Sequence, residues 1–235
     1  MGQAKQEIAA TPQRPSFSTS TTTTHAGWLE LEAGVSVDKK LIDSPLVLKL
    51  GATQNFELFA GFSPLIRVSD GISEAGSGDV FLGGRWRFKG GTAKSPSFAG
   101  QFSLKLPTAD QDKQLGSGRV DYNLLFIAAH SFRGFGLDFN TGLTLAGIPD
   151  GGTDEQASGI LTLSRTIASN LSGFAELFVN HSFEFGETTV IGSAGGSYAV
   201  NPRFVLDGAI NFNISNAPFD LRILGGATVT VTNIW

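Results

Sequence analysis

The side chains that could take part in catalysis are few and lie far apart along the chain. The histidines are His25, His130 and His181, and the chain has no cysteine. Neither the G-x-S-x-G turn that exposes a serine nucleophile nor the zinc-binding H-E-x-x-H sequence occurs. Glu30 and Glu32 share one face of an expected strand, where such neighbours usually join a salt-bridge network or face solvent. The sequence therefore predicts a protein that is not an enzyme and needs no cofactor.

An acidic stretch, PDGGTDEQ, is the one candidate for a metal site. It contains Asp150, Asp154 and Glu155 beside two glycines. Acidic loops can hold calcium, but the D-x-D-x-D-G spacing of a dedicated calcium loop is missing. We predict a solvated turn there and no metal.

The polar face of the alternating stretches carries eight acidic and five basic side chains. Such charges can pair across strands as a structural network, or form a selectivity filter if a continuous water path exists. We favour the structural network and expect Asp79, Arg85, Arg87 and Asp121 to form its centre. The full set is Glu30, Glu32, Lys49, Glu57, Asp79, Arg85, Arg87, Lys105, Asp121, Asp138, Glu176, Asp207 and Arg222.

Composition excludes several classes of protein. Of 235 residues, 16% are charged and 30 are glycine, against roughly 25% charged and ~7% glycine in ordinary soluble domains. The net charge of −4 offers no basic surface for a nucleic acid. No apolar run approaches the ~18 residues of a membrane helix, so a helical membrane protein is excluded.

Residues 1–26 form a polar segment separate from the rest of the chain. They contain Pro12, Pro15 and the run SFSTSTTTT, which favour an extended conformation. The segment could fold into the mouth of a barrel and narrow it. The first residues, MGQAKQEI, lack the apolar core of an export signal, and we expect that a signal has been removed.

Residues 27–235 read as twelve antiparallel strands, because apolar and polar residues alternate in stretches of about 8 to 13 residues. No helical period interrupts them. The expected strands are Trp28–Val37, Leu46–Thr53, Phe56–Leu65, Asp79–Phe88, Phe98–Leu106, Val120–Phe132, Phe135–Ala146, Ala157–Arg165, Leu171–Phe183, Thr189–Val200, Phe204–Ile214 and Leu221–Trp235.

The connections between these strands alternate in length. Turns such as Gln54–Asn55 and Arg133–Gly134 are short, whereas links such as Asp38–Pro45, Ile66–Gly78 and Pro107–Arg119 are mostly longer. With an even number of strands, all the short turns lie at one end. That arrangement is typical of outer-membrane barrels, which have short periplasmic turns and long outer loops.

Each strand is apolar on one face and polar on the other. In the stretch Phe98–Leu106, one face carries Phe98, Phe102 and Leu104, and the other carries small or polar residues. The bulk and continuity of the apolar faces favour a lipid-facing exterior around a polar lumen. A soluble ligand-binding barrel with the apolar face inside remains the alternative.

Aromatic residues gather near the short-turn end in the apolar phase, as a ring at a membrane interface would. Trp28 is out of phase with its strand, and only a bulge would place it. The expected interface residues are Phe56, Trp86, Phe88, Phe98, Phe132, Phe135, Tyr198, Phe204 and Trp235.

Three stretches resemble the outer-membrane proteins described as the MetA pathway of phenol degradation, also described simply as transporters. They are RPSFSTSTTTTHAGWLELEAG, GSGDVFLGGRWRF and LKLPTADQDKQLGSGRVD. In that family the first is similar to a T-x-R-P-D-F-T-E-S opening, and the others to a G-x-G-D segment and an L-P-T-G-D loop. The last strand, which ends on Trp235, resembles the carboxy-terminal signal that the outer-membrane insertion machinery recognises.

The sequence thus predicts an all-β, transmembrane, antiparallel up-and-down barrel of about twelve strands in a bacterial outer membrane. The resemblance implies passive passage of small molecules, hydrophobic or aromatic ones included. The expected partners are the lipid bilayer, the insertion machinery and a small solute. A plugged barrel with a structural or surface-interaction role is the other alternative.

Overall fold

The computed structural model describes residues 8–69, 71, 73–149 and 151–235, and its regular structure consists of strands alone. The first seven residues of the expected amino-terminal segment, and Asp150 of the acidic loop, lie outside the described residues. The strands are β1 (Trp28–Val37), β2 (Leu41–Asp43), β3 (Leu46–Gly51), β4 (Phe56–Phe62), β5 (Ile66–Ser69), β6 (Ser73–Gly76), β7 (Val80–Lys89), β8 (Ser97–Leu106), β9 (Asp121–Phe132), β10 (Phe135–Gly147), β11 (Thr153–Ala168), β12 (Leu171–Ser182), β13 (Glu187–Asn201), β14 (Phe204–Ser215) and β15 (Leu221–Asn233).

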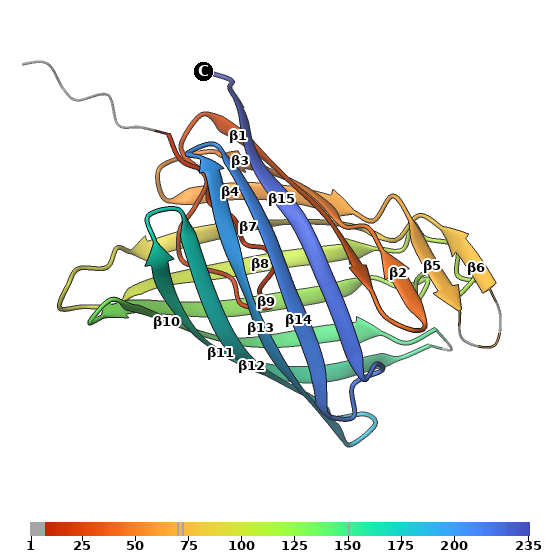
Figure 1. The fold of residues 1–235 in the computed structure, drawn as a ribbon. Coiled ribbons are helices and arrows are strands. Elements are labelled where there is room, and N and C mark those ends of the chain that lie inside the picture. The colour runs from red at the N-terminus through yellow and green to blue at the C-terminus, as the bar shows by residue number, and fades with distance from the viewer. Residues whose placement is uncertain (1–7, 70, 72, 150) are drawn as a thin grey trace, which may run out of the picture.

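Twelve of these strands close into an antiparallel barrel (Figure 1). Each pairs with its neighbour in chain order, from β1, β3, β4 and β7 through β8 to β15, and β15 then pairs with β1 along the whole length of β1. Closure removes every exposed edge from the wall. The predicted fold class and strand number are confirmed.

The short strands β2, β5 and β6 extend one side of the barrel beyond the loop end (Figure 1). The links Asp38–Pro45 and Ile66–Gly78, expected as loops, therefore contain strands, and that expectation is wrong. Pro45 and Pro64 each interrupt a strand, because proline has no amide hydrogen for the ladder. Pairing resumes beyond each proline, where β2 meets β5.

Two other strands are longer than predicted. β11 has 16 residues and β13 has 15, so the loops on either side of them are short. The added part of β11 is polar on both faces, as at Asp154 and Glu155, and its sequence therefore suggested a loop. The ladder nevertheless pairs them with β10.

The apolar faces point outward. Leu124, Leu143 and Ile223 are 57%, 61% and 57% exposed, whereas residues of the opposite phase, such as Asn140 and Ile127, are fully buried inside the barrel. Such a continuous apolar exterior requires lipid rather than water. This result rules out the alternative of a soluble barrel with inverted faces.

Trp28 begins β1 beside a bulge whose extra residue, Val231, belongs to β15. The register between β1 and β15 shifts between Leu29 and Glu30. The indole then packs beneath Arg203, whose guanidinium carbon lies 4.6 Å from the ring centroid. The bulge leaves the rest of β1 in the phase that the sequence predicts.

Among the described residues there is no helix long and apolar enough to cross a membrane.

Candidate functional site

Residues 8–26, called the plug below, lie inside the barrel rather than beside it (Figure 1). The plug enters at the short-turn end, where the Ala10 amide donates to the Pro202 carbonyl over 2.7 Å. It returns to the same end, where the Thr23 hydroxyl donates to the Gln54 carbonyl. Both Pro202 and Gln54 belong to short turns, so the plug is a loop that dips into the lumen and leaves the same way.

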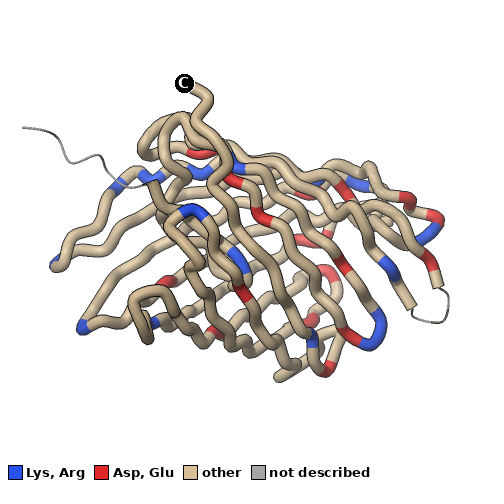
Figure 2. The backbone as a smooth tube through the Cα atoms, turned by 45° about the horizontal axis from the view of Figure 1, so that its top comes forward, with Lys and Arg blue, Asp and Glu red and all other residues tan. Residues whose placement is uncertain are grey.

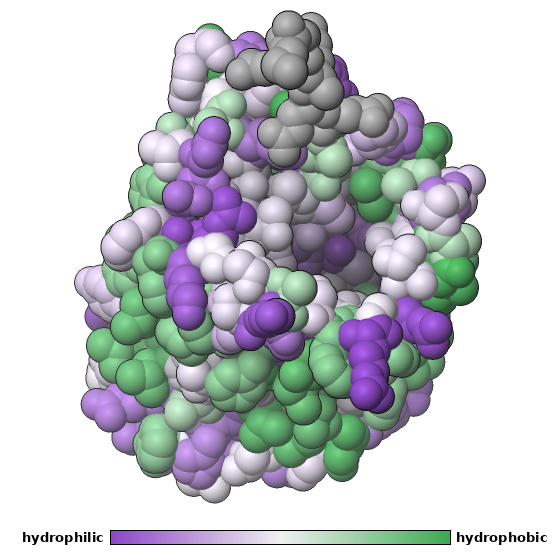
Figure 3. Space-filling view, turned by 90° about the vertical axis from the view of Figure 1, so that its left-hand side faces the viewer, coloured by the Kyte–Doolittle hydropathy of each residue, from purple (hydrophilic) through white to green (hydrophobic). Residues whose placement is uncertain are grey.

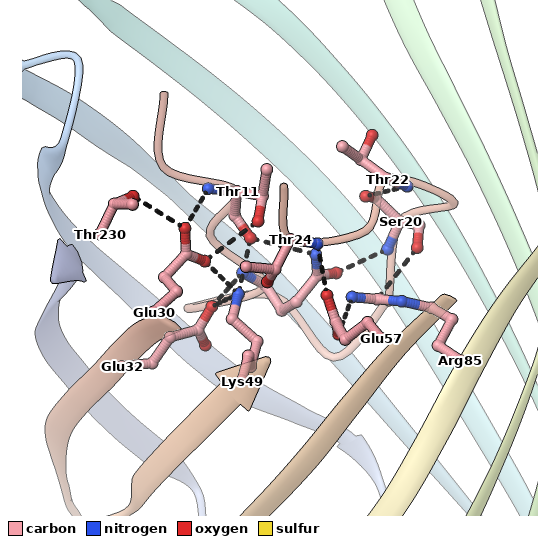
Figure 4. Close-up of polar contacts among 11 residues, drawn as sticks. Thr11, Ser20, Thr22, Thr24, Glu30, Glu32, Lys49, Glu57, Arg85 and Thr230 are labelled. Atoms are coloured by element: carbon pink, nitrogen blue, oxygen red, sulfur yellow. Dashed lines mark hydrogen bonds and ion pairs between the residues drawn. The ribbon is translucent and has the colours of Figure 1, made fainter. Parts of the chain in front are cut away.

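The first contact of the plug is with two carboxylates of β1 (Figure 4). The Thr11 amide donates to Glu30 and the Gln13 amide to Glu32, both over 2.8 Å. Lys49 of β3 lies 2.5 Å from each carboxylate, and its ammonium also donates to the Thr11 carbonyl. Glu30 and Lys49 are directly opposite in the β1–β3 ladder, which explains why they meet. The wall thus holds the backbone of the plug through a buried ion triad.

A second wall contact lies further round the barrel (Figure 4). Glu57 of β4 and Arg85 of β7 are opposite one another and form an ion pair of 2.5 Å, with both side chains fully buried. Glu57 accepts from the Thr24 amide over 2.6 Å, and Arg85 donates to the Ser20 carbonyl over 3.0 Å. Each member of this pair therefore also binds the plug.

The far wall holds the middle of the plug. Glu176 of β12 accepts from the Phe17 and Ser18 amides, from the Ser16 hydroxyl and from Thr162. Asn140 of β10 makes two hydrogen bonds to the Thr19 backbone. The plug therefore spans the lumen from β1 to β12.

Arg14 enters a recess that glycines create in the wall. Its guanidinium donates to the Gly225 carbonyl over 3.1 Å and lies 3.6 Å from Asp207 of β14, which is fully buried. A methyl group added at Gly34 would overlap this guanidinium. A methyl group at Gly51 would similarly overlap the His25 backbone, where the plug joins β1. Gly34 and Gly51 therefore allow the plug to approach the wall closely, and their role is not one of backbone conformation.

An apolar row crosses the lumen wall, and sequence reasoning missed it. Ile127, Ile160 and Ile191 are buried and lie in register with Ala99, Asn140 and Phe178 across β8 to β13. The Phe17 ring of the plug stacks on Phe178 with 5.0 Å between centroids. The lumen is therefore polar near the short-turn end, and this apolar row lies further from that end.

The other charged residues of the predicted network form separate groups. Charged positions of both signs are spread along the barrel from one end to the other (Figure 2). Lys105 pairs with Asp121 over 2.7 Å and with Asp79 over 3.6 Å near the loop end. Arg87 lies at the short-turn rim and donates to Asn55 and the Gln54 carbonyl. The expectation that Asp79, Arg85, Arg87 and Asp121 form one central cluster is wrong, because the strands place them at three different depths.

At the loop end, Arg222 joins two loops. It lies 2.7 Å from Asp38 and packs on Phe219 with 4.1 Å to the ring centroid. Burial raises the pKa of the Asp38 carboxyl, but hydrogen bonds from the Lys40 amide, Arg222 and the Leu41 amide outweigh burial and hold that pKa below its usual value. Asp38 is therefore ionised at neutral pH.

The nine predicted interface aromatics lie at the short-turn end and at the carboxy terminus. Trp86, Phe132 and Trp235 are the most exposed, whereas Phe56, Phe98 and Phe204 are only partly exposed. Several of the rings touch, as Phe88 does with Trp86 and Phe98. A second set of exposed aromatics, absent from the prediction, lies near the loop end: Phe62, Tyr122, Phe183, Phe185 and Phe212.

Two cavities remain beside the plug at the short-turn end, where a space-filling view shows a hollow with hydrophilic residues inside it (Figure 3). One has a volume of about 600 Å³ and lies between Ser20–Thr22 and the walls of β9 and β10. The other, of about 160 Å³, lies between the plug and β11 to β13. Among the described residues, no group of His, Asp and Glu side chains is arranged to hold a metal.

A closed twelve-stranded barrel with an apolar exterior and a polar, segment-filled lumen defines a bacterial outer-membrane β-barrel protein. The family model described as "Putative MetA-pathway of phenol degradation" matches residues 13–235, and the chain belongs to that family.

Solved structures share this fold at low sequence identity. The COG4313 outer membrane channel from Pseudomonas putida F1 is 12% identical, with a TM-score of 0.75 over 92% of this chain and 100% of that one. The KdgM porin in complex with disordered oligogalacturonate is 9% identical, with a TM-score of 0.63 over 86% and 99%. The NanC porin is 6% identical, with a TM-score of 0.61 over 87% and 100%. No curated protein sequence matches this chain significantly.

Proposed function

We propose that this protein is a passive channel for small molecules in the outer membrane, and that the plug narrows its periplasmic half. Short turns face the periplasm in outer-membrane barrels, which places the entry of the plug on that side. The observation that carries the proposal is the pair of cavities that persist beside the plug, each bordered by several serine and threonine residues. The channels and porins with the same fold support it.

The lumen offers two kinds of surface to a solute. Polar molecules would meet hydroxyls and the Asp138 carboxylate at the short-turn end. An aromatic molecule would meet Ile127 and Ile160 only when the plug moves aside, because both side chains are buried while it is in place. We propose that small solutes with both polar and apolar parts pass most easily.

A plugged barrel with a structural role is the second candidate. The favouring observation is the set of carboxylates, Glu30, Glu32, Glu57 and Glu176, that fasten the backbone of the plug to the wall. A plug held so firmly would also suit a protein that never opens.

We also propose that the chain has no catalytic role. Within the described part of the chain, the His130 Nδ1 atom has no hydrogen-bond partner, and His181 bonds Thr188 rather than a serine or carboxylate. Insertion would proceed through the terminal strand β15, beyond which Trp235 is exposed.

Solute release from liposomes tests the channel proposal. We expect liposomes that contain the refolded full chain to release a labelled monosaccharide and to retain a large dextran, whereas protein-free liposomes retain both. Protease protection of the strands confirms insertion. Retention of the monosaccharide by liposomes with inserted protein would contradict the channel and favour the plugged barrel.

A further inference from the structure

Asp138 of β10 is the one carboxylate of the predicted network that lines both cavities beside the plug. Ser20 of the plug and Ser164 of β11 also border both cavities, so these three residues mark the place where the two adjoin. We treat the two cavities together as one space, called the crevice below. It follows the wall from β8 to β13 around the plug.

The walls of the crevice supply oxygen atoms. Hydroxyl groups come from five strands, and they are those of Ser97, Ser131, Thr162, Ser164, Ser172 and Ser197. Hydroxyl and carboxylate oxygens can replace part of the hydration shell of a cation. Hydroxyl groups can also donate to an anion, so the choice between cation and anion depends on the carboxylate of Asp138, which attracts the one and repels the other.

The charge of the crevice is not balanced. In the described structure, Asp138 forms no hydrogen bond and no ion pair. In the ladder, Asp138 pairs with Thr162 of β11, and Thr162 pairs with Glu176 of β12. Glu176 is bound by amides and hydroxyls rather than by a cation. The cation that lines the smaller cavity is Arg14, which is already opposed by Asp207. A net negative field therefore remains around Asp138.

We propose that the crevice binds small monovalent cations, inorganic or organic ammonium ions, and that Asp138 is the residue that determines this preference. The consequence for transport rests on the proposed channel function. In an open channel, cationic solutes pass the plug more readily than anionic ones. Other lumen carboxylates do not have this role, because they line neither cavity and are already engaged. Glu176 is held by amides and hydroxyls, and the others contact Lys49, Arg85, Lys105 or Arg14.

Thiol labelling tests this proposal without any need for current or flux. The chain has no cysteine, so Ser164→Cys introduces a single thiol beside Asp138. The folded variant in detergent is reacted with a trimethylammonium methanethiosulfonate and, separately, with the sulfonate analogue of similar size. The ratio of the two rates, divided by the ratio for a free thiol in solution, reports the charge preference of the crevice.

We expect the normalised ratio to favour the cationic reagent by about tenfold, and to fall close to one when Asp138→Asn is added. The matched control is Ser164→Cys with Asp121→Asn, which removes the same charge near the loop end and should keep the preference. An unchanged ratio in Asp138→Asn would overturn the role of Asp138. Failure of both reagents to react with folded protein would show that the crevice is closed and overturn the binding site. Labelling with the expected preference, but no solute release from liposomes, would contradict the channel alone.

Discussion

Replacing Lys49 by methionine is expected to lower the free energy of unfolding by about 3–5 kcal/mol, because it leaves two buried carboxylates without their shared cation. The Lys49, Glu30 and Glu32 side chains are 3%, 1% and 3% exposed, so water cannot replace the ammonium while the plug is in place. Denaturant titration of the refolded protein in detergent measures the change.

Lys105→Met is the matched control for this prediction. Lys105 also bridges two carboxylates, Asp79 and Asp121, but its side chain is 28% exposed. Solvent screens such a pair, and we expect a loss nearer to ~1 kcal/mol. Equal losses in the two variants would mean that the Lys49 triad is hydrated and does not hold the plug.

Arg14→Met should release the middle of the plug from the wall. The substitution leaves Asp207 buried with no cation near it, and within the described structure no donor satisfies its carboxylate oxygens. A penalty of about 3 kcal/mol corresponds to roughly a hundredfold faster local opening. Hydrogen exchange at the amides of residues 11–18, followed by mass spectrometry, should show that increase.

The double variant Arg14→Met/Asp207→Asn separates this explanation from simple loss of packing. It removes both charges, so exchange should return most of the way to the rate of the unmodified chain. Arg133→Met, which changes an arginine packed on the exposed Phe132 ring, should leave exchange in the plug unaltered. Exchange that stays fast in the double variant would show that the arginine stem, and not its charge, positions the plug.

The barrel itself could be predicted from the sequence because its strands are amphipathic in a simple way. β10 was expected at Phe135–Ala146 and runs Phe135–Gly147, since its apolar and polar residues alternate without a break. The bulge near Trp28 lies in β15, where Val231 is the extra residue, so β1 keeps Glu30 inward and Leu31 outward by simple alternation. The alternation of apolar and polar residues within each strand is enough to predict the strand and its two faces.

The partners of the lumen side chains could not be predicted, because they depend on register between strands. Lys49 meets Glu30 only because β1 and β3 pair at those positions, across a connection in which β2 was not recognised. Ile160 and Ile191 each look like a single apolar residue on a polar face, and Ile127 shares its face only with Leu125 and Ala129 as apolar neighbours. Only the ladder places them in one row.

The contacts of the plug were hidden for another reason. The wall carboxylates bind its backbone amides, as at Thr11, Gln13, Phe17 and Thr24, so its side chains carry little signal of the interaction. The Ser and Thr residues of the segment indicate an extended polar chain, and nothing in their order indicates which wall they face.

The narrowing of an open lumen by residues 8–26 can be measured. Its most direct test is single-channel conductance in planar bilayers of the full chain beside a variant that lacks residues 2–25, with insertion of both confirmed. We predict discrete current steps for the full chain and steps several times larger for the variant, because the Glu57 and Glu176 side of the lumen would fill with water. Equal conductance of the two proteins would show that residues 8–26 do not narrow the lumen.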